Sequence, residues 1–259
     1  MILLSPSKTQ DFLTPSPTKR SKKLIFPNET EQLSKVLKKL SKKELAELMH
    51  VSPKLAELTY GRFKNWNGNF SSKDSGYKQA LFAFKGDVYK AFDDEKYTAD
   101  DISYMEKNIK IISGFYGLLT PLTNIKPYRL EMGTKLSFKV GVHEYKSLYQ
   151  YWREVLTAKL MKEMQGDELL INLASVEYSK AIDLKQFGER VVNIQFKVSK
   201  NGVPKTVAIF AKRQRGQMAY WVTKNRVETV AGLKKYRNDG FAFSKDLSSN
   251  NNLVFVKKA

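Results

Sequence analysis

The stretch 192–211, VNIQFKVSKNGVPKTVAIFA, carries the clearest secondary-structure signal in the chain. Over its first seven residues apolar side chains alternate with polar ones, which is the period of a strand that buries one face. Asn201-Gly202 follows, and this pair favours a two-residue turn with positive φ at both positions. The apolar residues from Val207 to Ala211 then supply a candidate return strand. The stretch therefore predicts a β-hairpin.

Helical and extended patterns alternate on both sides of this hairpin. A long amphipathic helix is indicated from Leu148 to Leu160, and Met218, Trp221 and Val222 suit a helix after the hairpin. Short apolar runs predict strands at 2–4, 80–84, 109–113, 169–173, 241–243 and 253–256, the last two as a second hairpin. This interspersion predicts an α/β (mixed α+β) fold, a single compact unit over residues 1–259 with a mixed β-sheet flanked by helices.

Three short helices are expected near the N-terminus, after an extended loop at 11–28 that is rich in Ser, Thr, Pro and Lys. The first has its apolar side chains at helical spacing between 33 and 40. Ser41 and Glu44 predict a capping box for the second helix. Ser52-Pro53 is a cap followed by proline at the first helical position, which opens a third helix to about residue 63.

The two helices within 44–63 resemble a helix-hairpin-helix element of the kind that binds DNA. Free backbone N–H groups at the start of the second helix would hold a phosphate, and basic side chains nearby would add charge. The DNA-binding candidates here are Ser52, Lys54, Arg62 and Lys64. His50-Val51-Ser52 replaces the usual Gly-x-Gly of such hairpins, so on the residues alone an ordinary helical hairpin is the simpler interpretation.

The charge balance indicates a polyanionic partner. The 259 residues include 45 Lys and Arg against 26 Asp and Glu, a net charge of +19. Residues 19–64 and 185–215 each carry a local +7, and the segment 93–106 between them carries −5. Such an excess favours nucleic acid first, an anionic membrane surface second and a small phosphorylated ligand third. A generally lysine-rich proteome is the alternative explanation.

A second basic run, AKRQRG at 211–216, follows the predicted return strand. Three cations in four positions rarely face inward, because a buried and unpaired cation is costly. Lys212, Arg213 and Arg215 are therefore further candidates for contact with DNA phosphates. A solvated turn explains the run equally well.

Polar residues follow the ends of several predicted strands, where α/β proteins form their ligand sites. We expect a polar cleft from these positions, with the members Lys8, Lys85, Asp87, Arg129, Glu131, Asn172 and Glu177. A buried and mutually satisfied ion network is the alternative, and spacing alone favours it. The pattern assigns no catalytic role to any of these residues.

Several site chemistries are excluded by residues that the chain lacks. It has no Cys, and therefore no disulfide, thiolate nucleophile or zinc finger of its own. It contains neither a Gly-x-x-x-x-Gly-Lys-Ser/Thr loop nor a Gly-x-Ser-x-Gly elbow, and its only imidazoles are His50 and His143. We expect no cofactor, no metal and a binding protein rather than an enzyme. The apolar opening is too short for a signal peptide and no stretch approaches ~20 apolar residues, so we expect a cytoplasmic protein without a membrane partner, and a monomer.

Strings spread over nearly the whole chain resemble the YaaA family, which is associated with resistance to peroxide stress. They are SPSKT (5–9), FKGDVY (84–89), SGFYGL (113–118), PYRLEM (127–132), LYQYW (148–152), INLAS (171–175) with Glu177-Tyr178, AKRQRG (211–216) and the segment 246–250. Ser7 stands where relatives often have alanine. The resemblance implies a compact α/β unit with a basic cleft, a helix-hairpin-helix-like element and binding to double-stranded or branched DNA. It also implies protection from peroxide that is linked to low intracellular free iron and limits oxidative DNA damage.

Two hypotheses of function stay open at this point. In the first, the protein binds DNA without sequence preference, through phosphate contacts made by the basic blocks. In the second, it is an enzyme acting on a phosphate-bearing or nucleotide-like ligand in the polar cleft, where Lys8, Asp87, Arg129 and Glu177 bind and exchange protons. Salt dependence separates the two, because contacts with the phosphate backbone weaken steeply with salt and an enclosed small-ligand site weakens much less.

Overall fold

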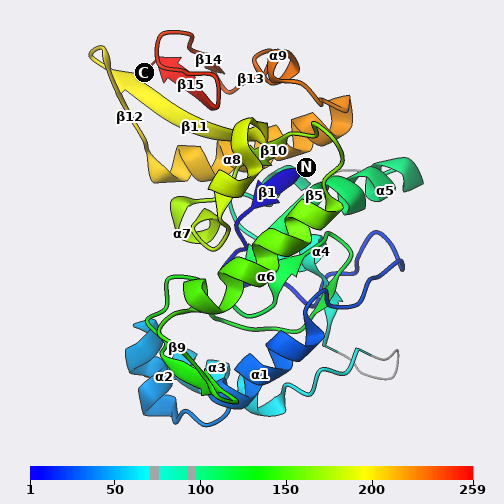
Figure 1. The fold of residues 1–259 in the computed structure, drawn as a ribbon, viewed down its shortest axis with the longest axis vertical. Helices are drawn as coiled ribbons and strands as arrows, with labels where there is room; N and C mark the ends of the chain where they lie inside the picture. The colour runs from blue at the N-terminus through cyan, green and yellow to red at the C-terminus, as the bar shows by residue number, and fades with distance from the viewer. Residues whose placement is uncertain (71–75, 93–96, 259) are drawn as a thin grey trace.

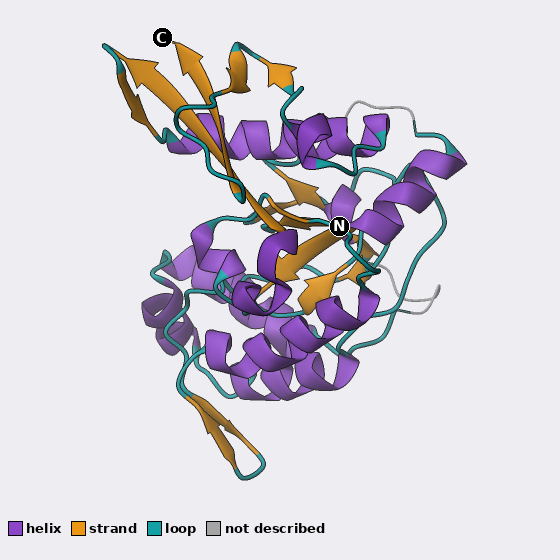
Figure 2. Ribbon diagram, turned by 45° about the horizontal axis from the view of Figure 1, so that its top comes forward, coloured by secondary structure: helices purple, strands orange, loops and turns teal. Residues whose placement is uncertain are grey.

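The computed structural model describes residues 1–70, 76–92 and 97–258, and a nine-stranded mixed sheet forms its centre (Figures 1 and 2). The strand order is β13-β14-β15-β11-β10-β1-β5-β6, with β12 paired to β11 outside this path. The strands that pair in parallel are β1 (Ile2–Leu4), β5 (Ile109–Ser113), β10 (Leu170–Asn172), β11 (Val191–Lys200) and β15 (Asn252–Lys258). The antiparallel strands are β6 (Gly117–Leu119), β12 (Val203–Lys205), β13 (Arg237–Asn238) and β14 (Phe241–Phe243). The predicted mixed sheet is confirmed, as is the pairing of 241–243 with the last strand.

Helices and short ladders surround this sheet. The ladders are β2 (Thr9–Gln10) with β4 (Phe84–Lys85), β3 (Lys78–Gln79) with β7 (Asn124–Ile125), and β8 (Phe138–Val140) with β9 (His143–Tyr145). The described α-helices are α1 (Pro27–Leu37), α2 (Lys42–Met49), α3 (Pro53–Asn65), α4 (Ala80–Ala83), α5 (Ala99–Asn108), α6 (Leu148–Glu163), α7 (Val176–Ser179), α8 (Ala208–Asn225) and α9 (Val230–Leu233). The 3₁₀ helices are η1 (Lys90–Phe92) and η2 (Leu184–Arg190). None of the helices in the described ranges is long and apolar enough to cross a membrane.

The N-terminal helices and the C-terminal strands lie at opposite ends of the molecule. In Figure 1 the helices α1, α2 and α3 gather with β9 at one end, while β11, β12, β14 and β15 extend at the other. The central strand β1 is completely buried, as are β5 and β10 beside it. Because both faces of these strands are buried, their sequences are short apolar runs and do not alternate between apolar and polar residues.

The helical hairpin at 42–65 forms as the capping residues predict. Ser41 and Glu44 make the capping box of α2, with the backbone N–H of Glu44 donating to Ser41 Oγ at 3.2 Å. Ser52 Oγ accepts from the backbone N–H of Leu55 at the start of α3. His50 adopts the left-handed conformation (φ 50°, ψ 52°) between the two helices, so the tight turn forms here without glycine. The DNA-binding role of this hairpin stays a prediction.

The return strand of the first hairpin lies elsewhere than predicted. Asn201 and Gly202 form the expected tight turn with φ of 52° and 77°, and β12 therefore begins immediately after them and ends at Lys205. The run 207–211, predicted as the strand, instead begins helix α8. Ile209 is 60% exposed, which shows that this run is not a buried strand. The basic run 211–216 is consequently helical and is not a turn.

The predicted strand at 80–84 is also wrong over most of its length. Residues 80–83 form the short helix α4, whose four side chains are all buried, and Phe84 begins β4. A short apolar run fits a buried helix as well as a buried strand, because burial on all sides removes the periodicity that separates them.

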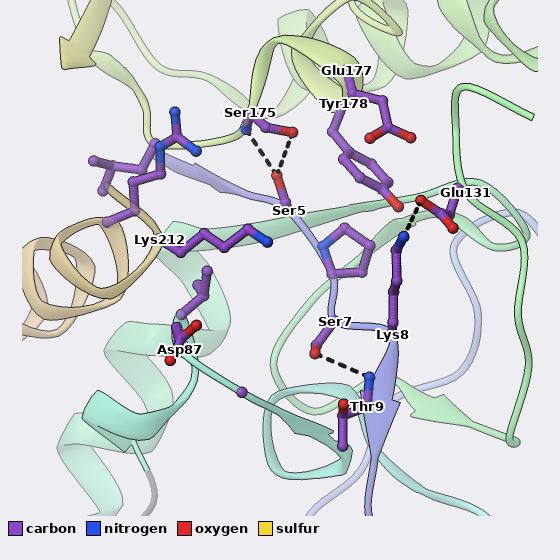
Figure 3. A pocket seen from close by; sticks show the side chains of 15 residues that line it. Ser5, Ser7, Lys8, Thr9, Asp87, Glu131, Ser175, Glu177, Tyr178 and Lys212 are labelled. Atoms are coloured by element: carbon purple, nitrogen blue, oxygen red, sulfur yellow. Dashed lines mark hydrogen bonds and ion pairs between the residues drawn. The ribbon is translucent and has the colours of Figure 1, made fainter. Parts of the chain in front are cut away.

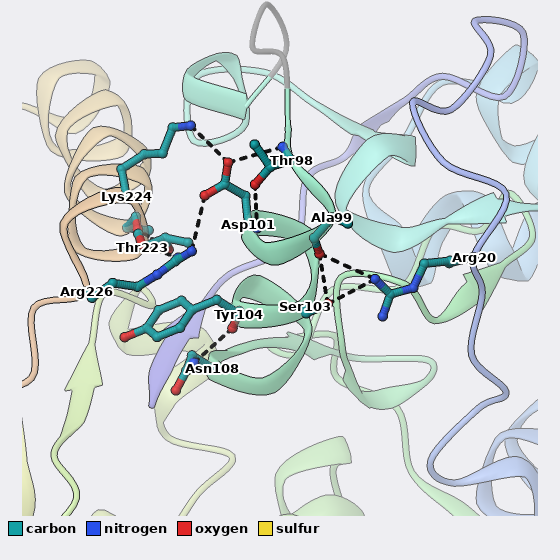
Figure 4. Close-up of polar contacts among 11 residues, drawn as sticks. Arg20, Thr98, Ala99, Asp101, Ser103, Tyr104, Asn108, Thr223, Lys224 and Arg226 are labelled. Carbon is teal, nitrogen blue, oxygen red and sulfur yellow. Dashed lines mark hydrogen bonds and ion pairs between the residues drawn. The ribbon is translucent and has the colours of Figure 1, made fainter.

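Helix α8 is fixed at its C-terminal end and at its middle. Asp101 of α5 binds Lys224 Nζ at 3.1 Å and Arg226 Nη2 at 3.2 Å, which joins the end of α8 to α5 (Figure 4). A Cβ on Gly216 would lie 1.8 Å from the backbone oxygen of Val88, so only glycine lets α8 approach the 86–88 loop this closely. These contacts fix the helix that carries part of the site described next.

Candidate functional site

A pocket of about 360 Å³ opens at the carboxyl ends of β1 and β10, which are neighbouring parallel strands. The next parallel strand after β1 in the chain is β5, and it lies on one side of β1 in the sheet. Strand β10 lies on the other side of β1, and the next parallel strand, β11, lies beyond β10. The order of the strands therefore reverses between β1 and β10. In open α/β sheets ligands bind in the crevice at such a switch point. The topology thus favours a ligand site where this pocket lies.

Two serines join the strand ends at the base of the pocket. The backbone N–H of Ser175 donates to Ser5 Oγ at 2.8 Å, and the two hydroxyl oxygens lie 3.3 Å apart. The buried Tyr89 donates its hydroxyl to the carbonyl oxygen of Ser5 at 2.8 Å, which fixes the chain as it leaves β1. Tyr178 lies nearby, and burial, with a smaller effect of the neighbouring phenol of Tyr128, raises its pKa. The Tyr178 hydroxyl is protonated at neutral pH, as that of an ordinary tyrosine is, and can donate a hydrogen bond.

One side of the pocket carries two carboxylates in different states of pairing (Figure 3). Glu131 Oε2 lies 2.7 Å from Lys8 Nζ, and Glu131 Oε1 lies 3.7 Å from Arg129 Nη2. Glu177 Oε1 accepts a hydrogen bond from the backbone N–H of Gly133 at 3.0 Å. Within the described part of the chain, no basic side chain lies within ion-pair distance of Glu177. One carboxylate is thus neutralised and the other is not.

The opposite side is formed by α8 and carries two cations. Lys212 and Arg215 lie three residues apart on this helix and both line the pocket, and Figure 3 shows Lys212 extending into it. Burial lowers the pKa of Arg215, and its Nε is buried without a hydrogen-bond partner. Arg213 lies on another face of the helix, 3.4 Å from Asp239. The basic run predicted for DNA contact is therefore divided between the pocket and the outer surface.

Four of the seven residues predicted for a polar cleft line this pocket, namely Lys8, Asp87, Glu131 and Glu177. Arg129 lines a small recess that adjoins the pocket through Lys8 and Glu131. The remaining two candidates line neither space. Lys85 pairs with Thr9 in the β2–β4 ladder, and Asn172 donates its side-chain amide to Asn193 Oδ1 at 2.8 Å.

Sequence reasoning missed the serines and the tyrosine of the site. Ser5, Ser175 and Tyr178 line the pocket, and the same strand-end rule that selected Glu177 could have selected them. Lys212 and Arg215 were predicted for DNA contact alone. The charged lining residues are three bases and three acids, Lys8, Lys212 and Arg215 with Asp87, Glu131 and Glu177. The cleft is therefore of mixed sign, whereas the family resemblance implied a basic one.

The basic residues of the helical hairpin differ in exposure. Ser52, Lys54 and Lys64 are exposed, and Lys64 Nζ lies 5.2 Å from the centre of the Tyr60 ring. Arg62 is half-buried, and burial, followed by the like charge of Arg129, lowers its pKa. Arg62 of α3 is therefore close to the arginine that lines the recess beside the pocket.

Comparison with known proteins agrees with the strings found in the sequence. A family model described as "Peroxide stress protein YaaA" matches residues 1–247. The chain belongs to the YaaA family. A UPF0246 protein of Alteromonas mediterranea is 41% identical over 99% of this chain and 98% of its own length. Membership in the YaaA family supports a role in peroxide stress, and all residues of the pocket lie within the matched range.

Proposed function

We propose that the protein protects cells from peroxide by binding double-stranded or branched DNA without sequence preference, through contacts with the phosphate backbone. The observation that carries this proposal is the arrangement of the two basic blocks. Arg62 of the first block lies near Arg129, whose recess adjoins the pocket that Lys212 and Arg215 of the second block line. The two blocks thus approach each other through these residues, while β11 and β12 of the second block extend away from α3.

The overall charge supports the same proposal. A net charge of +19 raises the local concentration of a polyanion around the protein and speeds its association. Lys54 and Lys64 are exposed on α3, which also carries the half-buried Arg62, and a duplex laid against the exposed side of this helix would exchange its counterions for the lysine side chains. Contacts of this kind position a duplex but read no base, so they predict binding to any sequence.

A protective role follows from where such binding places the protein. A protein that covers DNA shields it from radicals that Fe²⁺ and peroxide generate nearby. The family resemblance extends the proposal to a low level of intracellular free iron. In cells that lack the protein, we expect lower survival in peroxide and more chelatable iron, and unchanged iron in such cells would remove the iron link while leaving DNA binding in place.

Gel-shift titration with a duplex and with a four-way junction tests the DNA proposal. Affinity should fall between about 50 and 200 mM salt with a log–log slope of roughly −0.9 for each phosphate neutralised. Replacing Lys54, Arg62 and Lys64 together by Gln should weaken binding and flatten this slope by about 3 if each contacts one phosphate. The matched control replaces the exposed Lys107, Lys162 and Lys235 by Gln, which removes three positive charges outside both blocks and away from the end of the molecule where α3 lies.

The comparison of the two triple variants shows whether α3 carries a DNA-binding surface. Equal losses in both would mean that only the net charge counts and that no DNA-binding surface exists on α3. A salt-independent affinity would contradict backbone contact altogether. Circular dichroism of each variant verifies that the fold is intact.

A further inference from the structure

The cations on the α8 side of the pocket form no ion pair among the described residues, although Asp87 also lines the pocket. In the ranges that the structure describes, no acid lies within ion-pair distance of Arg215 or Lys212, and Arg215 Nε is buried without a hydrogen-bond partner. A buried cation without an anion is costly. The contact of Gly216 with the 86–88 loop holds this part of the helix in place, so Arg215 cannot avoid the cost by a shift of α8.

The same fold neutralises other buried cations. Lys78, 6% exposed, binds Asp11 at 3.3 Å, and Lys110, also 6% exposed, binds Glu163 at 2.7 Å. The fold thus places an acid beside each of these two buried lysines. The missing acid beside Arg215 indicates an anion that comes from outside the chain.

The carboxylate on the opposite side is complementary. Glu177 is held through one oxygen by the backbone N–H of Gly133, and it lacks a basic partner among the described residues. Figure 3 shows Glu177 and Lys212 on different sides of the pocket, with Ser5 between them. Glu177 lies in the first turn of α7, just after β10, and in α/β dinucleotide sites a carboxylate near the end of a strand accepts hydrogen bonds from ribose hydroxyls. The volume of about 360 Å³ lies within the range of small-ligand pockets.

We propose that this pocket binds a ribose 5-phosphate group, free or as part of a nucleoside monophosphate, with its phosphate at Arg215 and Lys212 and its ribose hydroxyls at Glu177. The hydroxyls of Ser5 and Ser175 lie at the base of the pocket to complete the hydrogen bonds of the ligand. This site shares Lys212 and Arg215 with the second basic block but does not involve α3. It lies at the switch point of the sheet, a feature that a surface for binding the DNA phosphate backbone does not require.

Isothermal titration calorimetry of the full chain with ribose 5-phosphate, AMP, dAMP and inorganic phosphate tests the proposal. Ribose 5-phosphate and AMP should bind, and dAMP, which lacks the 2′-hydroxyl, should bind at least about tenfold more weakly than AMP because a hydrogen bond to Glu177 is lost. In Glu177→Ala, which removes the acceptor oxygens, the preference for AMP over dAMP should disappear. An undiminished preference in that variant would refute the role of Glu177.

The phosphate subsite is tested by a matched pair on one helix. Arg215→Met should weaken AMP at least about tenfold, and Arg213→Met, which removes an exposed arginine outside the pocket, should leave AMP binding unchanged. Removing a half-buried, unpaired cation should also raise the melting temperature of the unliganded protein, whereas loss of a structural residue would lower it. Should Arg215→Met fail to fold, Lys212→Gln, at an exposed position, gives the same readout.

Duplex DNA and small ligands distinguish this proposal from the DNA proposal. If no small phosphate compound binds at millimolar concentration while Arg215→Met weakens duplex binding, the subsite belongs to the DNA backbone and the ligand proposal is overturned. If AMP binds and duplex DNA does not, the ligand proposal stands and the DNA proposal fails. Inorganic phosphate binding as tightly as AMP would show an anion site without a ribose subsite and would also overturn the proposal.

Discussion

Replacing Gly216 by alanine should destabilise the protein although alanine is the better helix former. Gly216 lies inside α8, and a Cβ at this position would meet the backbone oxygen of Val88 at 1.8 Å and its carbonyl carbon at 2.6 Å. Ordinary carbon contacts begin near about 3.5 Å, so α8 and the loop must separate by roughly 1.5 Å. The obstructing atoms belong to the backbone and cannot rotate away. Overpacking of this severity costs about 3 kcal/mol, and the helix propensity of alanine returns about 1 kcal/mol.

The expected net loss is therefore about 2 kcal/mol, or roughly 4–8 °C in melting temperature for a chain of this size. Gly61→Ala is the matched control, because Gly61 is also inside a helix and a Cβ added there would have no atom within 4 Å. That variant should gain about 0.5–1 kcal/mol. Urea unfolding followed by circular dichroism measures both variants. Equal shifts of the same sign would refute the claim that close contact between α8 and the loop requires glycine.

Three further predictions concern stability. Asp101→Ala should cost about 2 kcal/mol, less than a fully buried pair because Lys224 is 33% exposed, while Asp100→Ala on the solvent side should cost under about 0.5 kcal/mol in the same thermal melts. Gly202→Ala should cost about 1 kcal/mol in urea unfolding, because φ of 77° strains any residue with a Cβ. Desolvation alone would raise the pKa of Asp101 and of Glu163, but hydrogen bonds and the charge of basic partners outweigh it and hold both below their ordinary values, so their stabilisation is complete above about pH 5 and is lost progressively as the pH falls below it. An acid titration of the melting temperature should show this loss, and it should be smaller in Asp101→Ala.

Structural elements that depend only on neighbouring residues could be predicted from the sequence. The capping box at Ser41 and Glu44 and the turn at Asn201-Gly202 formed as expected, since each needs only residues a few positions apart. The two errors, at 80–84 and 207–211, concern apolar runs of five residues. Their conformation depends on what surrounds them in the fold, and a single sequence contains no record of that.

The site was predictable in part, for a related reason. The strand-end rule selected Lys8, Asp87, Glu131 and Glu177, because each follows a strand or a loop whose approximate end could be read. The rule could not say which strands are neighbours, and the pocket exists because β10 lies beside β1. Arg215 required in addition that 207–216 be helical, since a turn would not have directed it into the pocket while Arg213 faces outward.

The distribution of half-buried arginines connects the two proposals physically. Arg62 and Arg215 each lack an acid within ion-pair distance in the described part of the chain, and Arg129, which shares Glu131 with Lys8, has a buried Nε without a partner. Arg215 lines the pocket, Arg129 lines the adjoining recess, and Arg62 lies near Arg129. Such an arrangement lowers stability, because like charges repel and desolvated cations are costly. The same chain pairs its buried Lys78 and Lys110, so the unpaired set marks the place where an external phosphate, from DNA or from a nucleotide, would offset the cost in binding.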